Sequence, residues 1–516
     1  MPDCSTLLQP LATSQETQAL SLANINYTNQ DFASLKSRLI NLIATKFDTD
    51  FNDMVEGDLA IMLIELWAFM ADTLSFKMDQ QISELFIDTV TEIDNAHRLA
   101  KLVGFKPTPP IAARAMFSAS INQVLTTDLV ITAATPVQIS SGDTPLVYEL
   151  FPADGNNQPI FDQDIIIPAG SLVNTSVIGL EGSTLETTYT GTDQPNQSIS
   201  LTNGPVLLDS VRVDVNGVRW TEVDAFTDSQ PRMEYRLEFD AEYNAYIMFG
   251  NGRAGMVPTV GAQVVVTYRT GGGTQGNIIG GAVNTQRNYA VPGFAFSVPV
   301  TFANYTRGEF GYDGDQIEDI RRKLPSWIKT QDRAVTGEDF KTLADQFASP
   351  YSGQVGKSIA VLRNYGCAAN IIDIYILAKN DANDLQPATD ELKFELMSHL
   401  TEKKMLTDFV CIKDGVIVSV DVNIDLTVPK FFRKFREEIL RKAELRAADF
   451  FQINQWEYAQ NLREMDLVKW LADIKEVKNI DITFTTSDPD NSGSYVTAKY
   501  NEIIRPDNIV VTIMFE

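Results

Sequence analysis

The fold of the middle of this chain is decided by the stretch YIMFGNGRAGMVPTVGAQVVVTYRTGGGTQGN, residues 246–277. It predicts a strand, a tight turn at Gly250-Asn251-Gly252, a short segment fixed by Pro258 and a second strand over Val264–Tyr268. A run of glycines then forms a tight structural loop after the second strand. We therefore expect strands and hairpins on both sides of this stretch.

The same composition extends outward from it. From Ala115 to about Pro299 the chain is rich in Val, Ile, Thr, Gly and Asn, with frequent turn signals. Valines alternate over 211–215, and Asn216-Gly217 then supplies a hairpin turn. Further strands are expected at 235–240, 244–249 and 262–269. These signals predict an all-β domain over residues 111–305, either a sandwich or a set of hairpins.

The N-terminal part follows a different pattern. Residues 1–25 are polar and predict a weakly ordered arm, and residues 26–110 predict a helical domain. Its second helix is expected to start near Asp58, with Asp58 as N-cap. The apolar stripe of this helix consists of Leu59, Met62, Leu63, Leu66, Met70 and Leu74, widened by Trp67 and Phe69. Such a stripe favours a core helix of a bundle, with an oligomer interface as the alternative.

The C-terminal half predicts two further domains, over 306–412 and 413–516. The first is α+β, with a helix that stops at Pro325 and a second helix opened by a capping box from Thr336 to Asp339. The last domain is expected to be a small sheet with helices on one face. Its predicted order is a strand over Val416–Ile424, helices at about 430–451 and 461–475, and strands at 479–485 and 508–515. The whole chain is therefore predicted to be multidomain α+β.

Composition excludes several function classes. The formal charge is −26, from 42 basic and 68 acidic residues, which disfavours binding to nucleic acid or to anionic lipid. The most apolar run, Leu59–Ala71, is too short to span a bilayer. The start of the chain lacks the features of a signal peptide, and three scattered cysteines disfavour a disulfide framework. We expect a soluble protein made in the cytoplasm, with neither a nucleic-acid partner nor membrane insertion.

The residues that usually carry chemistry are sparse. The two histidines, His97 and His399, lie far apart in helical patterns, and no nucleophile-elbow, zinc-protease or paired-cysteine motif occurs. The loop 488–493 matches only the first half of a calcium-binding loop, because Lys499 stands where the bidentate Glu should be. The run 271–276 lacks the Lys-Ser/Thr and the following helix of a phosphate loop. We expect no catalytic, cofactor-binding or metal-binding residues and no enzyme activity.

One basic and aromatic segment stands out, KFFRKFR at 430–436. On a helix Phe432, Phe435 and Ile439 share a face, which favours core packing with a solvated basic edge. The alternatives are a basic contact for an acidic partner and, because aromatic and basic residues alternate, a single-stranded nucleic-acid site. Phe432 and Phe435, together with Trp67 and Phe69, are therefore candidate interface residues.

The stretch quoted first also carries a family resemblance. Its pattern resembles the signature of baseplate J-like proteins, a family that includes baseplate wedge subunits of T-even and other contractile-tailed phages. Weaker similarity lies in 333–340, in 57–59 and in 100–107. The residues that carry the main pattern are Phe249, Gly250, Gly252, Arg253, Gly255, Pro258, Tyr268, Gly272, Gly276 and Asn277.

The resemblance implies a scaffold without an active site. Such a subunit would pair with a second copy and with other wedge and hub proteins, in a ring around the tail hub that rearranges on contraction. It would reside in the virion tail baseplate after assembly in the host cytoplasm. A phage-derived bacterial injection system is an alternative setting. Rival readings are a receptor-binding, adhesin-like virion protein, from the Thr- and Asn-rich β region, and a hydrolase that uses a carboxylate pair.

Overall fold

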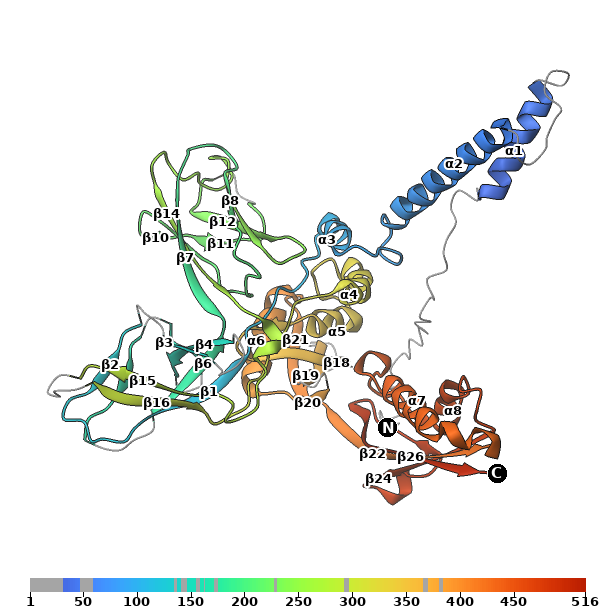
Figure 1. The fold of residues 1–516 in the computed structure, drawn as a ribbon. Coiled ribbons are helices and arrows are strands. Elements are labelled where there is room, and N and C mark those ends of the chain that lie inside the picture. Colours follow the sequence, from blue (N-terminus) through green and yellow to red (C-terminus); the bar gives the residue numbers. More distant parts are fainter. Residues whose placement is uncertain are drawn as a thin grey trace. The chain divides into compact units, whose positions relative to one another are not determined.

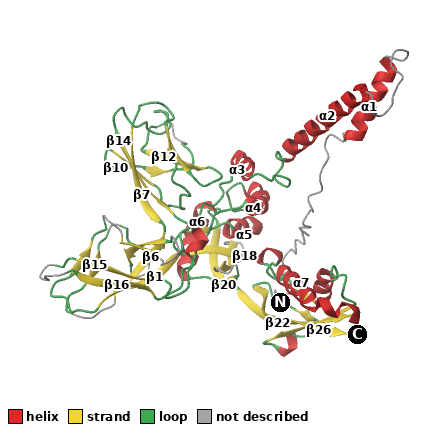
Figure 2. Ribbon diagram, viewed as in Figure 1, coloured by secondary structure: helices red, strands yellow, loops and turns green. Residues whose placement is uncertain are grey.

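The computed structural model describes residues 31–46, 59–133, 137–140, 146–154, 158–161, 163–170, 175–226, 230–291, 297–364, 370–379 and 384–516. Over these residues the chain is multidomain α+β, as predicted (Figures 1 and 2). The predicted arm at 1–25 and the N-cap at Asp58 lie outside them. The chain divides into two units, Met1–Pro107 with Asp315–Pro325, and Thr108–Gly314 with Ser326–Glu516. The predicted domain boundaries at 110, 305 and 412 stay predictions.

The first unit is helical. Its elements are α1 (Phe32–Lys46), α2 (Leu59–Ser83), α3 (Ile93–Leu102) and the first part of α4 (Ile317–Thr330). Helix α1 lies beside α2, and Lys36 pairs with Glu65 at 2.6 Å (Figure 1). In the turn before α3, the Glu84 carboxylate accepts hydrogen bonds from the Thr91 and Glu92 amides. Among the described residues, no helix is long and apolar enough to cross a bilayer.

The expectation that Pro325 stops a helix is wrong. Helix α4 continues through the proline to Thr330. A proline inside a helix removes one hydrogen bond and costs about 3 kcal/mol or more. Packing compensates here, because Ile320 and Leu324 are buried before the proline and Trp327 packs against a hydrophobic core after it.

The second unit begins with a six-stranded sheet in the order β15-β16-β1-β6-β4-β3. The sheet curls, since Arg287 on one edge strand donates to the Gln138 carbonyl on the other at 3.0 Å. One hydrophobic core fills it, and the β2–β5 pair packs against that core. The strands are β1 (Arg114–Ile121), β2 (Leu129–Ile131), β3 (Val137–Ser140), β4 (Val147–Pro152), β5 (Ile165–Ile167), β6 (Thr175–Glu181), β15 (Asn284–Tyr289) and β16 (Val298–Asn304).

A β-sandwich follows, made of two four-stranded sheets in the orders β10-β9-β14-β7 and β11-β12-β13-β8. The two sheets share one core. The predicted strands at 235–240, 244–249 and 262–269 and the Asn216-Gly217 hairpin are confirmed. The strands are β7 (Ser183–Thr190), β8 (Ser198–Leu201), β9 (Arg212–Val215), β10 (Val218–Arg219), β11 (Thr221–Glu222), β12 (Glu234–Phe239), β13 (Ala245–Phe249) and β14 (Gln263–Thr270).

The next part is a five-stranded sheet whose core packs against α5 and α6. The predicted capping box is present: the Asp339 amide donates to the Thr336 hydroxyl at 3.2 Å, and the Thr336 amide donates to the Asp339 carboxylate at 2.8 Å. The elements are α5 (Gly337–Asp345), β17 (Ala348–Ser349), β18 (Gly353–Asn364), β19 (Asn370–Lys379), β20 (Leu385–Pro387), α6 (Asp390–Lys403) and β21 (Asp408–Asp414).

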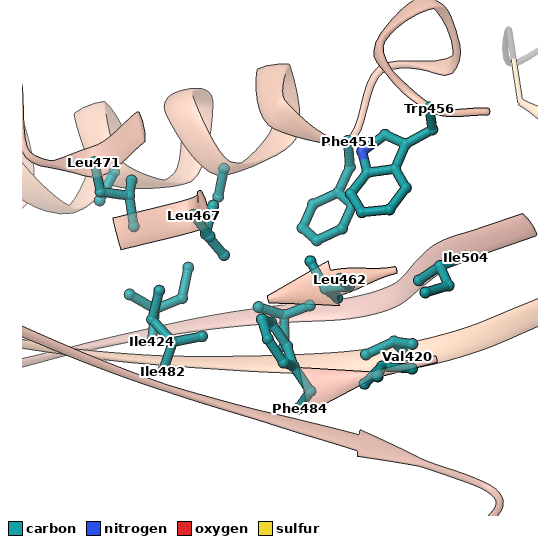
Figure 3. Close-up of a cluster of buried hydrophobic side chains, with 14 of the residues drawn as sticks. Val420, Ile424, Phe451, Trp456, Leu462, Leu467, Leu471, Ile482, Phe484 and Ile504 are labelled. Atoms are coloured by element: carbon teal, nitrogen blue, oxygen red, sulfur yellow. The ribbon is translucent and has the colours of Figure 1, made fainter. Parts of the chain in front are cut away.

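The chain ends in a three-stranded sheet, β24-β22-β26, with helices on one face as predicted. Figure 3 shows the core between them, where Leu467 and Leu471 lie over Ile424 and Ile482. The helix predicted at 430–451 is confirmed over 436–450 and is preceded by a 3-10 helix, and the one predicted at 461–475 is confirmed over 464–471, after a short strand. The elements are β22 (Val416–Val428), η3 (Lys430–Phe435), α7 (Arg436–Phe450), η4 (Ile453–Gln455), β23 (Leu462–Arg463), α8 (Glu464–Leu471), β24 (Asn479–Thr486), η5 (Pro489–Asn491), β25 (Tyr495–Val496) and β26 (Glu502–Phe515).

Candidate functional site

The first half of the predicted motif is a tight turn at the end of β13. Phe249 is fully buried and packs edge-on against Trp220, with ring centroids 5.4 Å apart. A Cβ at Gly250 would lie 2.3 Å from the carbonyl oxygens of Ala254 and Gly255, which is closer than any side chain tolerates. Gly250 therefore permits a close approach of two backbone segments.

The rest of this turn closes on itself. The Asn251 side-chain oxygen accepts hydrogen bonds from the amides of Arg253 and Ala254, both at 2.9 Å. Gly252 and Gly255 have φ of +83° and +73°, in the region that favours glycine. Pro258 and Tyr268 are buried, and Arg253 is exposed. The turn is thus held by its own backbone, with Arg253 projecting from it.

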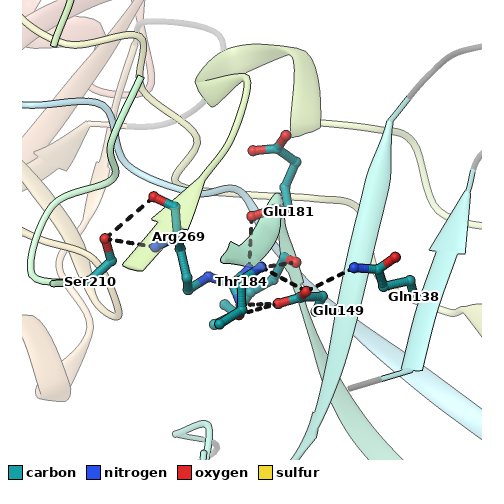
Figure 4. Close-up of polar contacts among 7 residues, drawn as sticks. Gln138, Glu149, Glu181, Thr184, Ser210 and Arg269 are labelled. Atoms are coloured by element: carbon teal, nitrogen blue, oxygen red, sulfur yellow. Dashed lines mark hydrogen bonds and ion pairs between the residues drawn. The ribbon is translucent and has the colours of Figure 1, made fainter. Parts of the chain in front are cut away.

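The second half of the motif joins the sandwich to the six-stranded sheet through a buried arginine (Figure 4). Arg269, at the end of β14, donates to the Glu149 carboxylate of β4 at 2.6 Å. It also donates to the carbonyl oxygens of Leu180 and Glu181 on β6, at 3.2 and 3.1 Å. Glu149 in turn accepts hydrogen bonds from the Thr184 amide and hydroxyl at 2.8 and 2.6 Å. The Arg269 guanidinium therefore links the sandwich to the six-stranded sheet, which we call the two β modules.

The glycines that follow let backbones meet without side chains between them. A Cβ at Gly276 would lie 2.5 Å from the Ala113 Cβ. The Asn277 side chain donates to the Gly311 carbonyl at 3.2 Å and accepts from the Gly311 amide at 2.9 Å. Tyr148 donates to the Gly276 carbonyl. The run 271–277 thus packs against the segment that leads out of the β region.

The glycine run 271–276 does not form an anion-binding site. The Gly272 amide already donates to Glu181 at 2.8 Å, and the Thr274 amide donates to Asp313 at 2.8 Å. Two carboxylates occupy the positions that a phosphate would need. Burial also raises the pKa of Glu181 above its ordinary value. The run forms a 3-10 helix, η2 (Gly273–Gly276), which is too short to focus a helix dipole.

A partly exposed charge cluster, which no local sequence pattern predicts, surrounds Glu457. Lys341 of α5 and Lys357 of β18 both pair with Glu457 at 2.5 Å, and Asp345 accepts from the Ser358 hydroxyl at 2.7 Å. Burial raises the pKa of Asp345 to about 6, against the attraction of Lys341. Glu457 lies 116 and 100 positions from Lys341 and Lys357, so no local pattern could have identified the cluster. The cluster joins the five-stranded sheet to the loop before β23.

Both histidines lie on helices, and the 488–493 loop forms a short turn between two strands. His97 is buried on α3, and His399 on α6 packs against Phe347, where burial lowers its pKa. The Asp488 carboxylate accepts from the Asp490 amide at 3.1 Å and so caps its own turn. Within the described residues, no group of three or more His, Cys, Asp or Glu side chains could hold a metal ion.

Helix α2 carries a broad exposed apolar surface. Among the apolar side chains of α2 that the structure describes, three are buried: Ile61, Ile64 and Ala68. Trp67 and Phe69 are 68% and 61% exposed. We predicted that the apolar stripe of α2 packs in the core of a helical bundle, and within a single chain this is wrong. Helix α1 is shorter than α2 and covers one side of it. The exposed residues are Leu59, Met62, Leu63, Leu66, Trp67, Phe69, Met70, Leu74, Phe76 and Met78.

The second pair of candidate interface residues lies on η3. Phe432 is half-buried and packs against the C-terminal core, whereas Phe435 is exposed. Phe431, which the helical pattern did not single out, is 85% exposed. Residues 430–435 form a 3-10 helix, and of the three residues that the α-helical pattern placed on one face only Ile439 is fully buried.

The helical unit supplies the match to a known family. Residues 31–102 match the family model described as "Bacteriophage baseplate protein, N-terminal domain". The matched segment contains α1, α2 and α3, and with them the exposed apolar surface of α2. No curated protein matches the chain in sequence.

Two solved structures are similar at low scores. One is a cryo-EM structure of the anti-feeding prophage (AFP) baseplate, with 9% identity and a TM-score of 0.37 over 91% of this chain and 90% of that chain. The other is the TssK-TssF-TssG baseplate subcomplex of the type VI secretion system, with 8% identity and a TM-score of 0.28 over 68% of this chain and 95% of that chain. Scores this low establish neither a common fold nor a common function.

Proposed function

We propose that this protein is a structural subunit of a contractile-tail baseplate, and that it works through protein surfaces rather than through chemistry at a site. The observation that carries the proposal is the coincidence of two features in one segment. Residues 31–102 match a baseplate N-terminal domain, and the same segment exposes the apolar side chains of α2. An exposed apolar surface of this size is typical of a helix that becomes covered by another protein.

In this proposal α2 forms a helical interface with a second copy and with another wedge subunit. The six-stranded sheet, the sandwich and the C-terminal domains then contribute surfaces toward neighbours in a ring around the tail hub, and that ring rearranges on contraction. The subunit assembles in the host cytoplasm and resides in the virion tail baseplate, or in the equivalent part of a phage-derived injection system. The glycine and arginine junction of 269–277 serves as a rigid joint in the β region.

The interface on α2 is tested with a double variant, Trp67→Gln with Phe69→Gln. Burying one such side chain contributes about 1.5–3 kcal/mol, and these two are about two-thirds exposed in the single chain. Replacing both should weaken the association through α2 by about 2–4 kcal/mol, or roughly 30- to 900-fold in Kd. The measurement is the mass of the purified full-length protein as a function of concentration, alone and with co-expressed neighbours.

The matched control is Phe394→Gln with Leu406→Gln, which removes two exposed apolar side chains outside α2. This control should leave the mass distribution unchanged. A wild-type protein that stays monomeric at every concentration and with every neighbour would contradict the proposal. A monomer that binds glycans would favour the adhesin-like alternative instead.

A further inference from the structure

The C-terminal sheet and the helices packed on it carry two surfaces of opposite charge that the proposed α2 interface does not use. The first, which we call the basic ridge, is formed by η3 and the start of α7. Its members are Lys430, Phe431, Arg433, Lys434, Phe435 and Arg436, all of them exposed. Arg433 and Lys434 make no ion pair with any residue that the structure describes. In a chain of net charge −26, this is a local concentration of four cations beside two exposed aromatic rings.

The second surface, the acidic face, is the side of the sheet β24-β22-β26 that faces away from α7 and α8. Its side chains alternate with the buried ones, as the pleat of a sheet requires. No Lys or Arg occurs in the segments 421–427, 479–485 and 508–514 that contribute to it. The members are Asp421, Asn423, Asp425, Thr427, Asn479, Asp481, Thr483, Thr485, Asn508, Val510, Thr512 and Met514.

The acidic face holds an unfavourable pair of like charges. Asp425 on β22 lies directly opposite Asp481 on β24 in the antiparallel register. Like charges in directly opposed positions destabilise a sheet, typically by a few tenths of a kcal/mol to about 1 kcal/mol. A cationic surface docked on this face would relieve the repulsion. Val510 and Met514, exposed on the same face, would offer apolar contact to aromatic side chains.

We infer that the basic ridge of one copy docks on the acidic face of a second copy, head to tail. The charges are complementary, and both surfaces carry exposed apolar side chains at Phe431, Phe435, Val510 and Met514. The ridge does not neutralise the face of its own copy, because among the described residues its one ion pair is Arg436 with Glu437, and it makes none with Asp425 or Asp481. The strong overall negative charge disfavours nucleic acid and anionic lipid as occupants of the ridge.

A head-to-tail contact has a structural consequence. Each copy uses one ridge and one face and leaves one of each free, so the contact closes into a ring or continues as a chain of subunits. This inference deepens the proposed role as a ring-forming subunit and rests on it. The contact itself is separate from α2, because the residues that form it lie beyond position 420.

The test uses full-length protein that carries Trp67→Gln and Phe69→Gln, so that association through α2 is strongly weakened. In this parent protein, one variant neutralises the ridge with Arg433→Gln and Lys434→Gln. A second variant neutralises the face with Asp425→Asn and Asp481→Asn. Masses are measured over a range of protein concentrations at low ionic strength, about 50 mM, where exposed charges are screened least.

The parent should form species larger than a dimer, and each neutralised variant alone should stay monomeric. An equimolar mixture of the two variants should form a 1:1 complex that does not grow, because only one intact ridge and one intact face remain. Raising the ionic strength to about 500 mM should weaken that complex at least tenfold. The control Lys469→Gln with Lys475→Gln removes two exposed cations of α8 and the loop that follows, and it should assemble like the parent.

A parent protein that stays monomeric, or a mixture of the two variants that does not associate, overturns the head-to-tail contact. Assembly of the parent that stops at a dimer also overturns it, because it indicates a two-fold contact. Loss of assembly in the control would attribute the effect to net charge instead. If the unmodified chain still dimerises through α2 in these cases, the proposed function stands and the ridge-to-face contact alone fails.

Discussion

Replacing the buried arginine of the junction, Arg269→Met, should loosen the joint between the two β modules. The guanidinium is almost fully buried, and so is its partner Glu149. Removing one member of a buried ion pair leaves the other charge uncompensated and costs about 3–5 kcal/mol. The methionine also leaves the carbonyl oxygens of Leu180 and Glu181 without their guanidinium donor. Glu149 keeps its hydrogen bonds from Thr184, so we place the expected loss at the lower part of that range.

The suitable measurement is hydrogen exchange of the amides in β4, β6 and β14. A chain with several domains has no single free energy of unfolding, whereas exchange reports local opening segment by segment. A loss of about 3 kcal/mol corresponds to exchange that is roughly a hundredfold faster in these strands. The strands of the C-terminal sheet should keep their protection. The double variant Arg269→Met with Glu149→Met should recover much of the loss, because it removes both buried charges.

The matched control is Arg253→Met, the same change at an exposed arginine of the same motif. Its effect should stay within about 0.5 kcal/mol. Equal protection of β6 and β14 in the two single variants would refute the reasoning. It would mean that the buried ion pair does not hold the modules together.

Three further changes test other parts of the fold. Gly276→Ala places a Cβ 2.5 Å from the Ala113 Cβ and should lower the free energy of local opening by about 1–3 kcal/mol. The control Gly280→Ala, whose Cβ would have no neighbour closer than 3.6 Å, should lower it by less than half of that. Thr336→Ala removes the capping box of α5 and should cost about 1 kcal/mol, measured by exchange in that helix. Asp345 has a folded pKa of about 6, above its ordinary 3.8, so its contribution to stability is favourable below about pH 4 and is lost as the pH rises through 6. Asp345→Asn should therefore make the α5 region more stable than wild type above pH 6, by up to about 3 kcal/mol, and an unchanged difference between the two proteins from pH 4 to 8 would contradict this.

Several elements follow from local pattern alone. The Asn216-Gly217 hairpin forms because these two residues adopt positive φ at little cost, here +50° and +78°. The capping box of α5 forms from residues three positions apart. The alternation along β22 decides which side chains enter the core, because successive side chains of a strand point to opposite faces. In each case the physical cause acts over a few residues, so the sequence contains all of it.

Other features depend on residues that meet only in the folded chain. Arg269 reaches Glu149 across 120 positions, and Glu457 meets Lys341 across 116 and Lys357 across 100. Sequence patterns carry no information on such pairs without the fold that brings them together. The same holds for α4, where packing on both sides of Pro325 outweighs the local penalty.

The sequence by itself determined that α2 is a helix with a broad apolar surface, because periodicity and composition are local properties. The tertiary structure alone decided what covers that surface: α1 buries one side, and Trp67, Phe69 and their neighbours stay exposed in the single chain. It likewise decided that Phe431 and Phe435 stay exposed beside the basic residues of 430–436, whereas the sequence favoured core packing of this segment's aromatic face. Exposure depends on what packs against a side chain, and that is settled only when distant segments come together.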